Sequence, residues 1–331
     1  MNILVTGGCG FIGSNFINYL LRDRSISRDI SITNLDLQTY AGKGGNIAHL
    51  GLDTHSRYTL VNGDIAESSL VRKVFEDFKP DLVFNFAAES HVDRSISNSS
   101  SFVRSNYDGV AVLLENARLS GVNRFVQIST DEVYGSIDQG QSSEEAPLNP
   151  SSPYSATKAG ADLLALSYSK THSIPLVITR SANNYGPFQF PEKILPLFIT
   201  NLIDGKKVPL MWSHENPGLN VRDWLHVDDN CRAIWSVAMS GKDGEVYNVP
   251  GENEKTNTEI TQILLNEFGF GQEMIERVPH RKAHDFRYSI SGEKLRSLGF
   301  RHKSLNLESE IKKLVKWYND NQSWWRPLKN A

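Results

Sequence analysis

The chain has 331 residues, of which 39% are hydrophobic and 22% are charged, and its formal net charge is -3. This composition is typical of a folded globular protein and excludes a disordered chain. The small net charge argues against a nucleic-acid or membrane-surface partner, and no apolar run approaches the roughly 18 residues that a membrane span needs. A chain of this length is expected to fold as two packed lobes.

The cysteines and the first residues favour the cytoplasm. Cys9 and Cys231 lie far apart and have no metal-ligand spacing, so we expect neither a disulfide framework nor a bound metal. The first apolar segment begins at residue 2, which leaves no room for a signal peptide. A cytoplasmic protein is therefore expected.

The first strand and helix are joined by a glycine-rich turn. An apolar strand at 3–5 runs into Gly7, Gly10 and Gly13, and a helical pattern follows. Glycines at this spacing allow a tight turn, close approach of the backbone to a pyrophosphate, and close packing of helix on strand. The helix N-terminus would supply N–H donors to the phosphates. A glycine-rich turn that binds nothing is the alternative, but the strand–loop–helix context favours a dinucleotide.

The next two expected strands each lead to an acid. The strand at 30–35 ends in Asp36, an acid placed to bond the adenosine ribose hydroxyls and to repel a 2′-phosphate, which favours NAD over NADP. The strand at 58–61 precedes Asp64, whose short side chain suits the adenine amino group. The polar loop 40–58 is expected to flank the adenosine.

The fourth expected strand ends just before a charged segment. Ala87 and Ala88 at its end are small enough for a cofactor to lie against the backbone. His91, Asp93 and Arg94 follow. Their pattern leaves two interpretations open, which are direct substrate contact and a charged cluster that orders a loop.

Two adjacent acids follow the fifth expected strand. A buried strand at 124–129 leads to Thr130, Asp131 and Glu132. The carboxyl ends of parallel strands are where open α/β sheets place their chemistry. Adjacent carboxylates can take opposite roles only if their pKa values differ, and burial with mutual repulsion would keep one of them protonated. An exposed acidic turn is the structural alternative, which the preceding buried strand disfavours.

A tyrosine and a lysine follow at helical spacing. Tyr154 and Lys158 are four residues apart, so on a helix they share one face. An ammonium beside the Tyr would stabilise the phenolate and lower the pKa of Tyr154, which makes it a candidate general base. With the glycines and the acids, this pattern predicts removal of water from a sugar with the help of a nicotinamide cofactor.

The second half breaks the regular alternation of strand and helix. We expect an isolated strand at 208–212, a late strand at 245–249, and helices at 194–204, 227–238, 259–268 and 307–318. The predicted fold class is α/β, with a Rossmann-type doubly wound parallel sheet and a smaller, interleaved C-terminal α/β substrate lobe. Residues 1–180 would bind NAD. Residues 181–331 would form most of the nucleotide-sugar lobe, with some segments returning to the first domain.

Taken together, these motifs resemble the extended short-chain dehydrogenase/reductase superfamily, and within it the dTDP-glucose 4,6-dehydratases. The resemblance runs from residue 2 to about 318, and its most specific part is the Asp-Glu pair. Besides the glycine turn and the Tyr-x-x-x-Lys spacing, it rests on the stretches 87–96, 129–135, 183–187, 190–193 and 220–224.

The resemblance implies a role for each central side chain. Tyr154 would take the proton of the sugar C4 hydroxyl as that carbon is oxidised, and Lys158 would hold the cofactor ribose and tune Tyr154. Thr130 would bond the C4 oxygen. Glu132 would remove the C5 hydrogen as a base, and Asp131 would protonate the departing C6 hydroxyl. NAD would be regenerated in each turnover.

The resemblance also implies binding positions. Further cofactor contacts would be Phe11, Ile12, Ile65, Ser105 and Asn184. Substrate contacts besides Thr130 would be Ser90, Asn183, Lys193, Arg222, Asn257 and His284. Lys193 and Arg222 suit a diphosphate, Arg through its bidentate fork. The stretch 280–285 keeps Arg281, His284 and Asp285 but lacks the family's Pro and Gly, which leaves thymidine and uridine nucleotides open.

Other functions fit parts of the pattern. A nucleotide-sugar 4-epimerase would share Tyr154, Lys158 and NAD but would not need the acid-base pair at 131–132. The same dehydration of UDP-glucose is a second alternative. A silent NAD-sensing or scaffold protein would need the glycines and could lose the Tyr, the Lys or the acids, all of which are present.

An apolar stripe on the expected helix 101–120 predicts a homodimer. Its members are Val103, Tyr107, Val110 and Leu114, and the helix that carries Tyr154 adds Leu163, Leu164 and Leu166. Two such helices can pair with those of a symmetry mate as a four-helix bundle. Burial of both helices within one monomer is the alternative.

Overall fold

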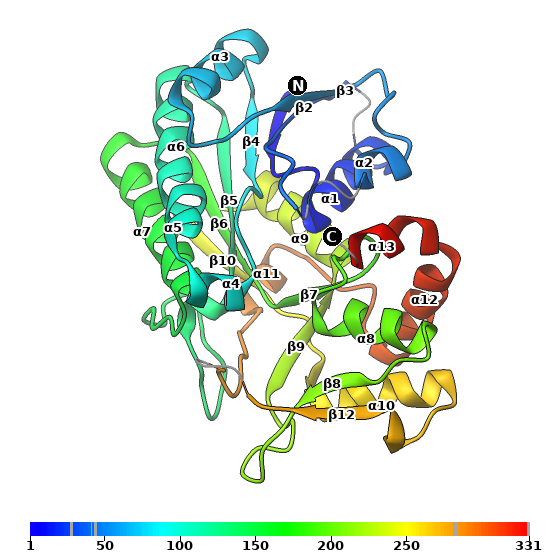
Figure 1. Ribbon diagram of the computed structural model, residues 1–331. Coiled ribbons are helices and arrows are strands. Elements are labelled where there is room, and N and C mark those ends of the chain that lie inside the picture. The colour runs from blue at the N-terminus through cyan, green and yellow to red at the C-terminus, as the bar shows by residue number, and fades with distance from the viewer. Residues whose placement is uncertain (27–28, 41, 43–44, 281–283, 330–331) are drawn as a thin grey trace.

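The computed structural model describes residues 1–26, 29–40, 42, 45–280 and 284–329. In this part of the chain, seven parallel strands form one sheet in the order β10-β6-β5-β4-β1-β2-β3 (Figure 1). The strands are β1 (Asn2–Thr6), β2 (Ser31–Asp36), β3 (Tyr58–Asn62), β4 (Leu82–Asn85), β5 (Arg124–Thr130), β6 (Leu176–Ser181) and β10 (Glu245–Val249). The predicted Rossmann-type α/β fold is confirmed.

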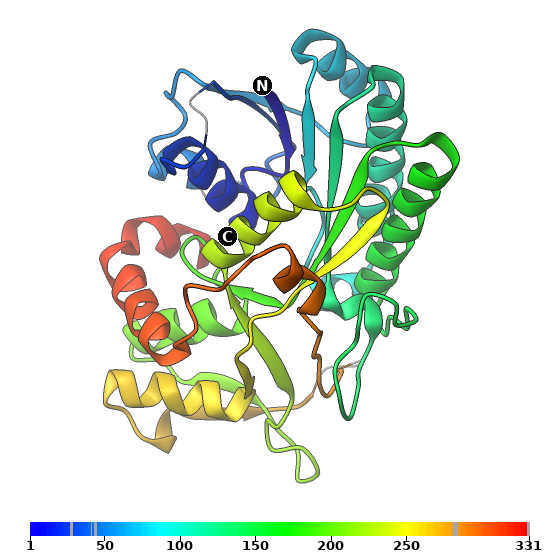
Figure 2. The same ribbon diagram turned by 180° about the vertical axis from the view of Figure 1, so that it is seen from behind.

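Helices cover both faces of this sheet because its strands are apolar on both sides. Along β1, Ile3 and Val5 face one core and Leu4 faces the other. Helices α1 (Phe11–Arg22) and α9 (Val227–Ser240) pack on the first face, and α3 (Ser68–Phe78), α6 (Gly109–Ser120) and α7 (Pro153–His172) cover the second. Figure 2 shows α9 crossing the face turned toward the viewer.

A smaller lobe lies beside the carboxyl edge of the sheet (Figure 1). It holds a three-stranded sheet of β11 (Glu254–Thr256), β9 (Val221–His226) and β7 (Asn183–Tyr185), and a pair formed by β12 (Ile275–Val278) and β8 (Val208–Met211). Its helices are α8 (Ile194–Ile203), α10 (Asn257–Phe268), α12 (Leu307–Asp320) and α13 (Gln322–Lys329). Aromatic and aliphatic side chains of these elements form a separate core.

One expectation for this lobe is wrong. The strand predicted at 208–212 is not isolated, because Val208 pairs with Ile275 in a parallel ladder. Residues 221–226, for which no element was predicted, form β9. Both pairings join segments far apart in the sequence, which local patterns do not encode. One strand from the second half of the chain, β10, joins the large sheet. The domain boundary near residue 180 stays a prediction.

In two regions of the first half of the chain, the secondary structure differs from the prediction. The helix expected at 101–120 consists of α5 (Ser100–Val103), a π-helical turn η1 (Arg104–Asp108) and α6. A π turn inserts one extra residue and changes the face on which later side chains lie. The loop 40–58 contains a short helix, α2 (Asn46–His49), and its residues 41 and 43–44 lie outside the described part. The remaining short helices are α4 (Val92–Ser97), η2 (Asp131–Tyr134), η3 (Gln272–Met274) and α11 (Glu293–Ser297).

A buried ion pair ties the helix α7 to the sheet. Arg180 Nε of β6 donates to Asp162 Oδ2 of α7 at 2.9 Å, and Ser129 Oγ of β5 donates to the same oxygen at 2.9 Å. Arg180 Nη1 also donates to Tyr134 Oη. All three elements therefore meet at Asp162, one turn beyond Lys158 on the same helix. Among the described helices, none is both long and apolar enough to cross a membrane.

We expect Asp162→Asn to lower the free energy of unfolding by about 3–5 kcal/mol, because it leaves the Arg180 charge buried without its partner. Asp243→Asn is the matched control: Asp243 pairs with Arg124 at 2.9 Å but is half exposed, and such pairs contribute less than about 1 kcal/mol. Urea unfolding of both variants checks this. Equal losses in the two variants would contradict the assigned role of the buried pair.

Candidate active site

A cavity of about 370 Å³ lies at the carboxyl ends of β1, β2, β4 and β5. It brings most predicted cofactor residues together with Tyr154 and Lys158. The predicted residues that line it are Gly7, Gly10, Phe11, Ile12, Gly13, Asp36, Asp64, Ile65, Ala87, Ala88, Ser90, Ser105, Tyr154, Lys158 and Lys193. The predicted residues outside this lining are Thr130, Asp131, Glu132, Asn183, Asn184, Arg222, Asn257 and His284.

The glycine turn has no room for side chains. Gly7 has φ +68°, in the left-handed region, and a Cβ there would stand 2.5 Å from Ala87 N. A Cβ at Gly13 would stand 2.4 Å from Gly7 O, whereas one at Gly10 would meet only that same oxygen, at 3.3 Å. The turn therefore leaves its backbone open beside the start of α1, as a pyrophosphate requires. The residues present fit NAD.

The two acids beside this turn are held by protein donors. Asp36 accepts the N–H groups of Cys9 at 2.8 Å and Gln38 at 2.6 Å, and burial raises its pKa. A carboxylate accepts about four hydrogen bonds, so Asp36 keeps capacity for ribose hydroxyls. Asp64 pairs with Arg104 at 2.9 Å. Arg104, which also lines the cavity, has no distinguishing sequence pattern and was missed.

Tyr154 and Lys158 lie in the first turns of α7. A capping box between Ser152 and Ser155 fixes the start of this helix, whose first residue is a proline. Lys158 Nζ donates to Ile128 O of β5 at 2.6 Å, which anchors the helix against the strand that leads to the acids. Both predicted residues therefore face the cavity from one side.

The pKa of Tyr154 differs from the expectation. Burial, followed by the charges of Glu132 and Asp131, raises the pKa of Tyr154, while a hydrogen bond with Thr130 lowers it in part. Burial lowers the pKa of Lys158 to about 8. The prediction that the pKa of Tyr154 is lowered is therefore wrong. A positive charge close to the phenol oxygen would favour the phenolate.

The lowered pKa of Lys158 predicts a pH-dependent stability difference. Its ordinary value is 10.5 and its folded value about 8, so the unfolded chain binds more protons between these pH values and stability rises with pH there. Lys158→Met lacks this rise. Its stability relative to the wild type should therefore fall by about 3 kcal/mol from pH 7 to pH 10.5.

Urea unfolding at several pH values in this window measures the change. The matched control is Lys170→Met, because Lys170 is exposed on the same helix. Parallel pH curves for Lys158→Met and the wild type would contradict the buried-amine assignment.

Asp131 and Glu132 differ in environment, as opposite roles require. Asp131 is buried, and its Oδ1 accepts from Thr130 Oγ1 at 3.2 Å. Within the described residues, Oδ2 is buried without a hydrogen-bond partner. Burial, then the charges of Glu132 and Asp223, raises the pKa of Asp131 well above its ordinary value. Glu132 is partly exposed. Of the two adjacent carboxyl groups, Asp131 is therefore the one whose environment favours the protonated form.

Strand β9 supplies charges to this pair. Arg222 is buried, donates to Asp285 O at 3.0 Å, and lies 4.4 Å from the ring centre of Tyr288. The charge of Arg222 opposes part of the rise in the pKa of Asp131, which burial causes first. Burial, then the charge of Glu132, raises the pKa of Tyr288. These effects place Arg222 and Tyr288 near the acids. Sequence reasoning missed Tyr288, since no local pattern links it to Arg222.

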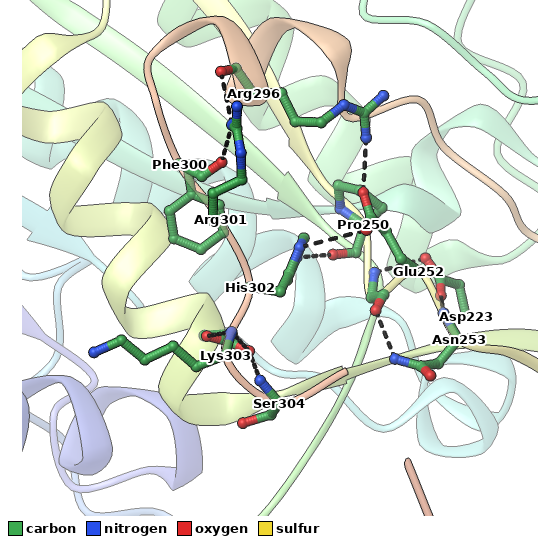
Figure 3. Close-up of polar contacts among 12 residues, drawn as sticks. Asp223, Pro250, Glu252, Asn253, Arg296, Phe300, Arg301, His302, Lys303 and Ser304 are labelled. Atoms are coloured by element: carbon green, nitrogen blue, oxygen red, sulfur yellow. Dashed lines mark hydrogen bonds and ion pairs between the residues drawn. The ribbon is translucent and has the colours of Figure 1, made fainter. Parts of the chain in front are cut away.

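The neighbouring carboxylate Asp223 is fixed by a tight turn. It accepts the N–H groups of Gly251 at 2.6 Å and Asn253 at 2.7 Å (Figure 3). Glu252, between them, has φ +58° and pairs with Arg296 at 2.7 Å. This turn holds Asp223 rigidly, so its charge acts on Asp131 from a fixed position.

The remaining predicted contacts lie on several elements. Lys193 Nζ donates to Ser90 O at 3.0 Å across the cavity edge. Asn183 Oδ1 is buried without a partner among the described residues. The side-chain Nδ2 of Asn184 donates hydrogen bonds to Ser181 Oγ and Ala182 O. Its Oδ1 accepts one from Asn230 Nδ2.

The last two predicted substrate contacts, Asn257 and His284, also lie in the smaller lobe. Asn257 begins α10, and its N–H donates to Asn220 O at 3.0 Å. The His284 ring lies 3.0 Å from that of His280, nitrogen to nitrogen. Arg281 and the rest of 281–283 lie outside the described residues. The nucleotide contacts implied for this stretch stay predictions.

The fold, glycine turn and Tyr-Lys helix define a nicotinamide-dependent enzyme of the extended short-chain dehydrogenase/reductase class. The family described as GDP-mannose 4,6 dehydratase matches residues 4–314. A dTDP-glucose 4,6-dehydratase of Streptomyces antibioticus is 48% identical over 99% of this chain and 96% of its own length. The chain belongs to the dTDP-glucose 4,6-dehydratase family.

Solved structures agree with this assignment. The dTDP-glucose 4,6-dehydratase DesIV of Streptomyces venezuelae, solved with NAD bound, is 45% identical with a TM-score of 0.94, and the match covers 99% of this chain and 100% of DesIV. A UDP-glucose 4-epimerase of Thermus thermophilus, in complex with NAD, has a TM-score of 0.87 but 27% identity, over 97% of this chain and 100% of its own. The epimerases share the fold at lower similarity.

Proposed function

We propose that the protein converts dTDP-glucose to dTDP-4-keto-6-deoxyglucose and water, with NAD as its cofactor. The observation that carries this proposal is Asp131, a buried acid with a raised pKa whose Oδ2 has no hydrogen-bond partner in the described part of the chain, directly before Glu132. An acid held protonated beside a base suits elimination of water across a C–C bond. The sequence identity of this chain to named dTDP-glucose 4,6-dehydratases supports dTDP-glucose as the substrate.

We infer each residue role from the family resemblance, and the positions of the side chains support it. NAD, when bound, would accept the hydride from C4 and return it to C6 as a proton returns to C5, so each turnover leaves the cofactor unchanged. Tyr154 removes the C4 hydroxyl proton and Thr130 holds the C4 oxygen, which agrees with the hydrogen bond between Tyr154 and Thr130, the last residue of β5. The resulting ketone acidifies the C5 hydrogen, which Glu132 removes. Asp131 donates its proton to the C6 hydroxyl, which leaves as water.

The same residues argue against a 4-epimerase. Epimerisation at C4 needs the tyrosine, the lysine and NAD, but it removes no hydroxyl and needs no protonated acid. Incubation with dTDP-glucose, and separately with UDP-glucose, without added cofactor tests the proposal. Mass and NMR analysis should show the 4-keto-6-deoxy product, faster from dTDP-glucose, and many turnovers without net NADH. Formation of only the C4 epimer, or a stoichiometric need for NAD, would contradict it.

We further propose that the protein is a cytoplasmic homodimer. Part of the predicted stripe is core, because Val110 and Leu114 are buried within the monomer. Val103, Tyr107 and Leu163 are exposed and lie on neighbouring elements, the last being 58% exposed. These apolar side chains support pairing through α5, η1 and α7. The buried thiols of Cys9 and Cys231 suit the reducing cytoplasm.

Leu163→Asp should convert the dimer to monomer at micromolar concentration, because it places a charge in the proposed interface. Light scattering measures the mass. The control is Met239→Asp, a similarly exposed apolar residue on α9 at the opposite face of the sheet, which should stay dimeric. A wild type of monomer mass would refute the dimer.

A further inference from the structure

Four side chains from three separate segments meet at one edge of the cofactor cavity. Glu192 of the smaller lobe lies at their centre. Its Oε1 accepts from Tyr40 Oη at 3.1 Å, and its Oε2 lies 3.4 Å from His91 Nε2 and 3.7 Å from Arg94 Nη2. Tyr40 follows β2, whereas His91 and Arg94 follow β4. We call these four residues the Glu192 cluster.

Stacking reinforces the polar contacts of the Glu192 cluster. The Arg94 guanidinium lies 3.7 Å from the centre of the Tyr40 ring, and Phe190 packs edge-on against the same Tyr40 ring at 5.4 Å between centres. A guanidinium over an aromatic face is attracted by the ring quadrupole. Burial, then Glu192, raises the pKa of Tyr40, so its hydroxyl stays a donor. These contacts support the interpretation that the charged residues at 91–94 order a loop.

The cluster does not need a charged histidine. His91 Nδ1 accepts the N–H of Arg94 at 3.4 Å. In the neutral ring the proton therefore lies on Nε2, the nitrogen that faces Glu192. Burial lowers the pKa of His91, which agrees with a neutral ring. Glu192 thus faces three groups that can donate to it.

The cluster spans the wall of the cavity. Glu192, Phe190 and Lys193 line it from the smaller lobe, and Thr39, Gly42 and Glu89 line it from the loops after β2 and β4. Tyr40 lies between Thr39 and Gly42 in the chain, in a loop that follows Asp36. A molecule bound from the glycine turn to Lys158 would lie behind these contacts.

We propose that the Glu192 cluster retains NAD in the protein between turnovers, by tying the loops after β2 and β4 to the smaller lobe. The proposal rests on the proposed function and deepens it, because a reaction that returns its hydride gains nothing from cofactor exchange. Release of NAD then requires these contacts to open. Loss of the Tyr40 hydrogen bond, the contact with neutral His91 and the partly exposed Arg94 ion pair should speed release roughly tenfold to a hundredfold.

The test compares three variants by a measurement that does not need turnover. Glu192→Gln keeps the shape and removes the charge. Tyr40→Phe removes one hydroxyl and keeps the stacked ring. The matched control is Glu252→Gln, whose carboxylate also joins an arginine and a histidine, Arg296 at 2.7 Å and His302 at 3.8 Å, but away from the cavity (Figure 3).

Each purified protein is passed through gel filtration, and its NAD content and the rate of NAD release are measured by chromatography of the released nucleotide. Glu192→Gln should lose NAD roughly ten to a hundred times faster than the wild type, and Tyr40→Phe several times faster. Glu252→Gln should match the wild type. Added NAD should restore turnover of Glu192→Gln, since no reacting group is changed.

Release of NAD at the wild-type rate from both Glu192→Gln and Tyr40→Phe would overturn the proposal, as would equal acceleration in Glu252→Gln. If Glu192→Gln does not fold, Tyr40→Phe decides alone. A wild type that retains NAD but yields no 4-keto product would contradict the proposed function and leave the retention result standing.

Discussion

Tyr154→Phe should form no detectable NADH when mixed with dTDP-glucose, and turnover should fall roughly 10²–10⁴-fold. The change removes only the phenol oxygen. The ring should keep its place, because it is buried and packs edge-on against Phe102 at 6.4 Å between centres. Without the phenol, the group assigned to take the C4 hydroxyl proton is missing, so the reaction should stop before its first oxidation.

Stopped-flow absorbance of NADH measures this first step directly. Thermal unfolding of Tyr154→Phe serves as the control, because a folded variant should unfold close to the wild type. NADH formation at the wild-type rate would show that another group acts as the first base. In that case Thr130 is the hydroxyl to examine next, since its side chain forms a hydrogen bond with Tyr154.

The large sheet and its cofactor edge could be predicted because both depend on local pattern. Parallel strands place their carboxyl ends at one edge, so Gly7, Asp36 and Ala87 had to come together once the strands were recognised. The Tyr154–Lys158 spacing needs only a helix. The glycine turn needs only residues without side chains, and a Cβ at Gly13 would collide with Gly7 O.

The rest depends on contacts that the sequence does not encode locally. The pairing of β8 with β12 joins residues 208 and 275, and β9 joins the end of β7 to β11. Tyr288 reaches Arg222 only through this arrangement. The pKa of Tyr154 was misjudged for the same reason, because burial and the charge of Glu132 act across space and outweigh the lysine four residues away.

Asp131→Asn should accumulate NADH and the 4-keto-glucose intermediate. Asparagine keeps the shape of the side chain but cannot give a proton to the C6 hydroxyl, so water loss should slow roughly 10²–10⁴-fold. Oxidation at C4 depends on Tyr154, Lys158 and NAD, and it should survive. The variant therefore stops one step later than Tyr154→Phe.

Glu132→Gln completes the comparison, since it should allow oxidation but block exchange of the C5 hydrogen with solvent deuterium. NADH absorbance, mass analysis of the sugar and deuterium incorporation separate the three stages. Asp131 is the residue on which the dehydratase assignment depends, because its burial favours the protonated form that the acid role requires. If Asp131→Asn loses water at the wild-type rate, the proton must come from another group, and the acid role falls even if the product is unchanged.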